Sequence, residues 1–189
     1  MGAELAEAIA ELSQLAGAHP ASPGRVTLRS EGRAGSLTLE HPEARNAVSI
    51  AMMRDLALAV EAALRAGLDT IVLRGAGAGF CAGGYLPEVR RALVEPEGAR
   101  AMCAGMTAVL DALSASPALV IAAIDGPAVG GGVELALAAD VRVIAPGAWM
   151  ELRQARLGVT AGWGGAHRLV RRVGPGAALV QGQGSRAVI

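Results

Sequence analysis

Two glycine-rich runs in this chain each follow a short apolar segment. Residues 70–74 lead into the glycine-rich residues 75–84, and the apolar residues 118–124 lead into the triplet at residues 130–132. Glycine lets a ligand approach the main chain closely, and the first N–H groups of a helix have no partner within the helix. A glycine triplet between a strand and a helix can therefore offer bare amides to an oxyanion.

Glu134 follows this triplet and falls within the first turn of the helix expected there. One interpretation places its carboxylate beside the bare amides as a chemical group. The other is that the glycines only allow close packing and that Glu134 complements the helix dipole, which is worth about 0.3–1 kcal/mol. This segment alone leaves both interpretations open.

The apolar spacing predicts alternating strands and helices. Strands are expected at residues 26–28, 36–39, 70–74, 119–124 and 141–145, and helices at 5–15, 49–66, 97–113, 132–139 and 164–173. Such alternation argues for an α/β fold with right-handed crossovers, but spacing alone does not separate a spiral of repeated units from a doubly wound sheet. We expect an N-terminal helix and linker (residues 1–24), one core domain (25–180) and an irregular tail (181–189).

The composition excludes several classes of protein. All 17 basic residues are arginine and the net charge is zero, which argues against a nucleic-acid partner. Without lysine there is no Schiff base and no phosphate loop of the Gly-Lys-Ser/Thr type. Cys81 and Cys103 lack the spacing of a disulfide framework or a zinc site, so no metal is expected. No apolar run approaches the roughly 20 residues of a membrane span, which predicts a soluble cytoplasmic protein without a membrane partner.

The two glycine loops together resemble the paired fingerprints of the crotonase superfamily, the enoyl-CoA hydratase/isomerase family. Residues 41–47 look like the family's adenine-side loop, residues 138–142 like the segment after its glycine-rich helix, and residues 157–169 like its later glycine loop and helix. The resemblance implies the crotonase-like (ClpP/crotonase) spiral of ββα units. It also implies an acyl-CoA thioester as substrate, with coenzyme A entering as part of that substrate and no separate cofactor.

By the family's pattern, the N–H groups of Gly84 and Gly131 would form the oxyanion hole for the thioester carbonyl. Glu134 matches the first of two glutamates that hydratases use to hold and activate water, and the second maps onto Gln154. Glutamine can orient a water but cannot give or take a proton, so hydration and isomerisation are disfavoured. We expect the nearby Glu151 to face solvent, because alternation puts it opposite Gln154.

Further substrate contacts follow from the same resemblance. Tyr85 stands where relatives often carry Asp, and Gly162, where the dehalogenase branch has its nucleophilic Asp, argues against covalent dehalogenation. The loop around Trp163 is similar to that of short-chain malonyl-CoA decarboxylases, such as those acting on ethylmalonyl-CoA, although the tryptophan could simply fill a pocket wall. The expected substrate-binding residues are Arg45, Ala47, Ala82, Gly83, Tyr85, Leu86, Gly130 and Trp163.

The sequence therefore predicts an enzyme that stabilises an enolate of an acyl-CoA, most naturally an enoyl-CoA hydratase-like lyase. A decarboxylase of methylmalonyl- or ethylmalonyl-CoA is one alternative, and a truncated CoA-binding paralogue without activity is another. Relatives continue beyond residue 180 with a helical region that helps to close the acyl pocket and to build a trimer. The resemblance implies a trimer-based homo-oligomer, and the short tail, which we interpret as a truncation, a frameshift or a naturally short form, counts against it.

Overall fold

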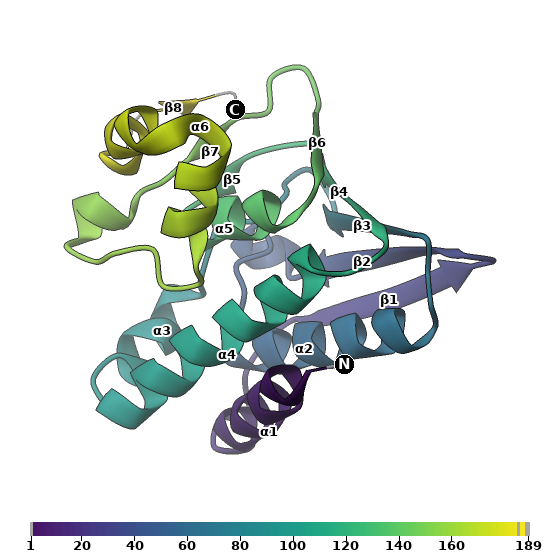
Figure 1. Ribbon diagram of the computed structural model, residues 1–189. Coiled ribbons are helices and arrows are strands. Elements are labelled where there is room, and N and C mark those ends of the chain that lie inside the picture. The colour runs from purple at the N-terminus through teal and green to yellow at the C-terminus, as the bar shows by residue number, and fades with distance from the viewer. Residues whose placement is uncertain (1, 185, 188–189) are drawn as a thin grey trace.

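The computed structural model describes residues 2–184 and 186–187 (Figure 1). Its helices are α1 (Ala3–Gly17), α2 (Ile50–Arg65), α3 (Leu86–Ala92), α4 (Pro96–Ser114), α5 (Gly131–Ala138) and α6 (Gly165–Gly182), with short 3-10 turns η1 (Pro42–Ala44) and η2 (Gln154–Leu157). Its strands are β1 (Arg25–Glu31), β2 (Ala34–Glu40), β3 (Thr70–Gly75), β4 (Leu119–Ile124), β5 (Ala128–Val129), β6 (Val141–Ile144), β7 (Met150–Glu151) and β8 (Arg186–Ala187).

A five-stranded sheet in the order β1-β2-β3-β4-β6 forms the larger layer. β1 and β2 contain the strands expected at residues 26–28 and 36–39 and form an antiparallel hairpin, and all later pairs in this sheet are parallel. A smaller sheet joins β5, β7 and β8. Because the parallel strands run the same way, the loops that follow β3 and β4 leave the larger sheet at one edge.

The chain repeats a unit of two extended segments followed by a helix. β1 and β2 precede α2, β4 and β5 precede α5, and β6 and β7 precede α6. After β3, Cys81 takes the place of the second strand, since it forms a parallel bridge with Ala128 of β5. The predicted α/β fold of repeated ββα units is therefore confirmed.

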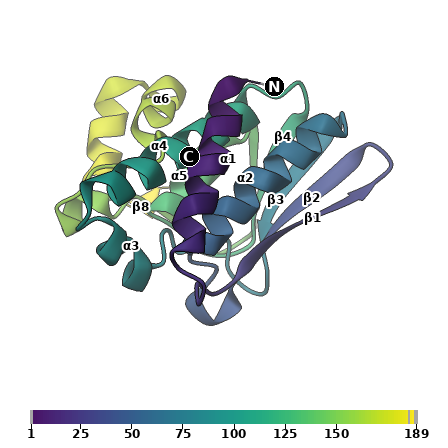
Figure 2. The ribbon, with the colours of Figure 1, turned by 90° about the horizontal axis from the view of Figure 1, so that it is seen from below.

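The helices α1, α2 and α4 lie on one side of the larger sheet (Figure 1). The view in Figure 2 shows α1 between α2 and α4. Its Leu12 is fully buried, and a methyl group added at Gly105 of α4 would lie 2.8 Å from Leu12 Cγ. The predicted leading helix therefore exists, and its apolar face packs into the main core.

Several element ends differ from those expected. Ser49, where the predicted helix 49–66 begins, caps α2, and its hydroxyl accepts a hydrogen bond from Met52 N at 3.2 Å. The last helix is interrupted at Gly174, which has φ +78°, and then continues from Pro175 to Gly182, well past residue 173. Proline at the start of a helical stretch loses no internal hydrogen bond, which explains the restart. Residues 186–187, expected to be irregular, form β8 against β7, whereas positions 185, 188 and 189 lie outside the described residues.

Candidate functional site

The two glycine loops lie side by side at the carboxyl ends of β3 and β4. Cys81 N donates to Pro127 O at 3.2 Å, and Val129 N donates to Cys81 O at 2.9 Å. A methyl group added at Gly83 would lie 3.1 Å from Gly131 N, and one at Gly132 would lie 2.2 Å from Cys81 O. The close approach of the two loops therefore requires glycine at both positions.

The amides of Gly84 and Gly131 have no hydrogen-bond partner within the described part of the chain. Gly84 forms a parallel bridge with Val48, in which Val48 N donates to Gly83 O at 2.7 Å and Tyr85 N donates to Val48 O at 2.8 Å. That pattern uses the groups on either side of Gly84 and leaves its own N–H turned away from Val48. Gly131 opens α5, where the first N–H groups lack a helical acceptor.

Glu134, in the first turn of α5, is 2% exposed. Its Oε2 accepts hydrogen bonds from Trp163 N and Gly165 N, both at 2.8 Å. Its Oε1 accepts from Gln154 Nε2 at 3.0 Å. Burial raises the pKa of this carboxyl, and the hydrogen bonds that it accepts oppose that rise only in part. Glu134 can therefore take and give a proton nearer to neutral pH than an exposed carboxyl can.

Gln154 opens η2 and lies between Glu134 and the glycine triplet. A methyl group added at Gly130 would lie 4.0 Å from the Gln154 carboxamide. The carbonyl oxygen Oε1 of Gln154 is buried and has no hydrogen-bond partner among the described residues. Leaving a buried acceptor unpaired costs about 1–3 kcal/mol, so this oxygen has the capacity to accept a proton donor.

Glu151 does not face solvent, and our expectation for it was wrong. The residue lies in β7, is 3% exposed, and forms ion pairs with Arg153 at 3.1 Å and Arg156 at 3.5 Å. Alternation fails as a guide here because the strand is two residues long and η2 begins at Gln154. The two arginines compensate the buried charge, so Glu151 supports the segment that carries Gln154.

The indole of Trp163 lies against both glycines with unpaired amides. A methyl group added at Gly131 would lie 2.3 Å from Trp163 Cζ3, and one at Gly84 would lie 3.7 Å from Cζ2. The residue is 5% exposed. Its carbonyl accepts a hydrogen bond from Arg168 Nη1 at 2.7 Å, and Arg168 in turn pairs with Asp111 at 2.5 Å. Trp163 thus lies next to the two amides and, through its own N–H, next to Glu134.

The remaining predicted residues border this centre. Ala82 N donates to Arg45 O at 3.0 Å, which joins the loop after η1 to the loop after β3. Tyr85 precedes Leu86 at the start of α3, and its ring meets that of His41 edge to face at 5.1 Å. The structure therefore gathers Gly83, Gly84, Gly130, Gly131, Glu134, Gln154 and Trp163 into one centre, with Arg45, Ala47, Ala82, Tyr85 and Leu86 on its flank.

The sequence analysis did not single out two side chains, Asn46 and Glu88, that hold together the segments around the site. Asn46 is buried, donates to the backbone oxygens of Ala76 and Gly79, both at 2.8 Å, and accepts from His41 N at 3.0 Å. Glu88 accepts a hydrogen bond from Ile50 N at 2.8 Å, which ties α3 to the start of α2. Asn46 follows the polar residues His41, Glu43 and Arg45, so its residue type did not mark it as buried, and nothing in the sequence pairs Glu88 with α2.

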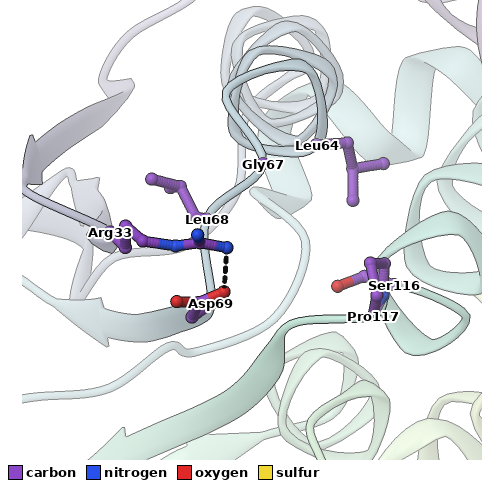
Figure 3. A pocket seen from close by; sticks show the side chains of 7 residues that line it. All are labelled: Arg33, Leu64, Gly67, Leu68, Asp69, Ser116 and Pro117. Carbon is purple, nitrogen blue, oxygen red and sulfur yellow. Dashed lines mark hydrogen bonds and ion pairs between the residues drawn. The ribbon is translucent and has the colours of Figure 1, made fainter.

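A separate cavity lies at the opposite edge of the larger sheet, where β3 and β4 begin. Figure 3 shows its lining, which includes the ion pair between Arg33 and Asp69 and the side chains of Leu64 and Ser116. It lies apart from the glycine loops, which follow the carboxyl ends of the same strands. Among the described residues, no three His, Cys, Asp or Glu side chains are placed to hold a metal ion, and no helix is long and apolar enough to cross a membrane.

Comparison with known proteins identifies the family. A sequence model described as "Enoyl-CoA hydratase/isomerase" matches residues 30–181. The ethylmalonyl-CoA decarboxylase of Gallus gallus is 37% identical over 172 residues, which make up 89% of this chain and 55% of that protein. The mitochondrial methylglutaconyl-CoA hydratase of Mus musculus is 39% identical over 133 residues, 69% of this chain and 41% of that protein.

The fold comparison agrees. The crystal structure of an enoyl-CoA hydratase from Polaromonas sp. JS666 matches with a TM-score of 0.80 at 33% identity, covering 87% of this chain and 65% of that one. The chain spans about half the length of the curated relatives that it matches. The family match over most of the chain, the fold and the paired glycine loops together show that the chain belongs to the enoyl-CoA hydratase/isomerase family.

Proposed function

We propose that this chain acts on acyl-CoA thioesters by stabilising an enolate, and that it forms the enolate by removing carbon dioxide from a short malonyl-type thioester. Coenzyme A enters as part of the substrate, and no separate cofactor takes part. The observation that carries the proposal is the buried carboxylate of Glu134, whose side-chain partner is the neutral amide of Gln154, beside two unpaired glycine amides.

The two amides supply the electrostatic part of the mechanism. In this proposal the N–H groups of Gly84 and Gly131 donate to the thioester oxygen, which gains negative charge as the enolate forms. Fixed donors aimed at a developing charge are usually the largest catalytic contribution, with one donor worth about 2.7–4 kcal/mol. Both N–H groups lack a partner within the described chain, so binding the oxygen would break no existing hydrogen bond.

Decarboxylation suits a site with one carboxylate. The bond between the α-carbon and the substrate carboxylate breaks, its electron pair forms the enolate, and carbon dioxide leaves. The α-carbon then takes a proton from Glu134, which regains one from solvent. Burial raises the pKa of Glu134 and so favours the acid form that this step requires. Because Gln154 is neutral, it adds no negative charge beside Glu134 that would repel the anionic substrate.

The relatives support both branches of the family. Ethylmalonyl-CoA decarboxylases of Danio rerio and Gallus gallus are 36% and 37% identical to this chain over the aligned residues. Hydration of an enoyl-CoA is the second candidate, and one observation favours it: the unpaired carbonyl oxygen of Gln154 could accept a hydrogen bond from a water. We rank it second because Gln154 cannot exchange a proton with that water.

Product analysis by mass spectrometry tests the proposal. The purified chain is incubated separately with ethylmalonyl-CoA, methylmalonyl-CoA and crotonyl-CoA. The proposal predicts loss of carbon dioxide from one or both malonyl-type thioesters and little gain of water on crotonyl-CoA. Hydration of crotonyl-CoA without decarboxylation would assign the second candidate, and three unchanged thioesters would indicate a non-catalytic relative.

A further inference from the structure

We infer that the indole of Trp163 limits the size of the acyl group and selects short acyl chains over long ones. This inference rests on the proposed function, because it takes the thioester oxygen to bind the amides of Gly84 and Gly131. It concerns the side chain alone, since the backbone N–H of Trp163 contacts Glu134 whatever side chain the residue carries.

The position of the ring follows from its three neighbours. Its six-membered edge lies against the Cα atoms of Gly131 and Gly84, where added methyl groups would come within 2.3 Å and 3.7 Å of ring carbons. The backbone of the same residue is hydrogen-bonded to Glu134 at 2.8 Å. When the thioester oxygen of the substrate binds the two amides, the α-carbon next to that carbonyl has to lie within reach of Glu134. This α-carbon therefore lies close to the indole. The ring stands on the acyl side of the site.

The ring is also held in place. The Trp163 carbonyl accepts from Arg168, which is 5% exposed and paired with Asp111. Gly165 N shares Glu134 Oε2 with Trp163 N, so the backbone on both sides of Gly164 is fixed. A buried side chain on a fixed backbone has little freedom to swing aside for a longer chain. The indole therefore forms a rigid wall of the acyl pocket and does not move aside for a longer acyl chain.

A wall and an open apolar pocket respond differently to chain length. In an open pocket each added methylene strengthens binding about fourfold, because more apolar surface leaves water. Against a wall the added carbons gain nothing or clash, and size discrimination of about 10–200-fold is typical of a hydrophobic pocket. The inference predicts that affinity stops rising between butyryl-CoA and octanoyl-CoA in the wild-type protein and rises once the indole is removed.

Isothermal titration calorimetry with butyryl-, hexanoyl- and octanoyl-CoA measures this without turnover, because these saturated thioesters carry no group to hydrate or decarboxylate. Trp163→Leu and Trp163→Ala are compared with Trp149→Phe, which changes the other tryptophan. Trp149 packs near Arg153, with the guanidinium carbon 6.0 Å from its ring. Circular dichroism checks that each variant is folded. If Trp163→Ala does not fold, the affinities measured with Trp163→Leu test the inference.

The expected result is that the affinity for octanoyl-CoA relative to butyryl-CoA rises at least tenfold in the Trp163 variants and stays at the wild-type value in Trp149→Phe. An unchanged ratio in the folded Trp163 variants, or a wild-type affinity that climbs steadily to octanoyl-CoA, would overturn the inference. A changed ratio in a protein that turns over no thioester would leave the inference standing and reject the proposed function. Turnover of a thioester together with an unchanged affinity ratio would support the proposed function and reject the inference about Trp163.

Discussion

Replacing Glu134 by glutamine should separate the activity of this chain from its stability. The side chain keeps its shape and loses its proton chemistry. A well-placed general acid contributes about 10²–10⁴-fold, so we expect decarboxylation of ethylmalonyl-CoA by Glu134→Gln to fall by at least about 100-fold. The carboxamide oxygen can still accept from Trp163 N and Gly165 N, as Oε2 does in the wild-type protein.

The same substitution should not weaken the fold. The new amide NH₂ would face Gln154, whose own amide can turn so that its buried, unpaired Oε1 accepts. The turned pair exchanges the wild-type hydrogen bond from Gln154 Nε2 to Glu134 Oε1 for one in the opposite direction, so the free energy of unfolding at pH 7 should stay within about 1 kcal/mol of the wild-type value. Urea denaturation measures it, with Glu151→Gln as the matched change of a second buried carboxylate outside the proposed chemistry.

The free energy of unfolding should also depend on pH differently in the wild type and in Glu134→Gln. The pKa of Glu134 lies above its ordinary value of 4.5 in the folded protein because the carboxyl is buried. The folded protein therefore binds this proton more tightly than the unfolded chain, and the free energy of unfolding falls as pH rises from about 4.5 through the raised pKa. In Glu134→Gln this contribution to the fall in the free energy of unfolding should be absent. Activity within threefold of wild type, or a fold weakened by more than about 2 kcal/mol, would refute the reasoning.

Three further changes follow from the site. Gln154→Glu adds the second carboxylate beside Glu134 and should raise water addition to crotonyl-CoA at least about tenfold in a spectrophotometric assay, where no gain would reject the role given to Gln154. Asn46→Ala removes the three hydrogen bonds of a buried side chain and should lower the free energy of unfolding by about 2–4 kcal/mol in urea, and a loss below 1 kcal/mol would contradict it. Gly132→Ala puts a methyl group 2.2 Å from a backbone oxygen and should destabilise the fold, whereas Gly176→Ala in α6, with nothing within 4 Å, should leave thermal unfolding unchanged or raise its midpoint.

The sequence predicted most of the framework because the signals were local. Apolar periodicity located both strands of the hairpin, the parallel strands of the larger sheet and five of the six helices, and the predicted helix 49–66 begins at Ser49, the cap of α2. The short helix α3 was missed, since Leu86–Ala92 carries no clear apolar stripe. The second half of α6 was missed because Gly174 and Pro175 are ordinary signs of a helix end.

Within the site, the family resemblance named the residues but not their contacts. It could not place the Trp163 ring against Gly131, because that contact joins elements far apart in the chain. It also could not show that Glu151 is buried between two arginines, since alternation within a two-residue strand carries little information. The hydrogen bonds of Asn46 depend on how three loop segments fold together, which the residue types in the sequence do not indicate.

Decarboxylation of ethylmalonyl-CoA in deuterium oxide tests the central claim most directly. If the chain forms an enolate that takes its proton from Glu134, whose own proton exchanges with solvent, mass spectrometry should find butyryl-CoA with one deuterium on the α-carbon. The Glu134→Gln variant should form it at least about 100-fold more slowly. Ethylmalonyl-CoA recovered intact from the folded wild-type chain, while crotonyl-CoA gains water, would contradict the account.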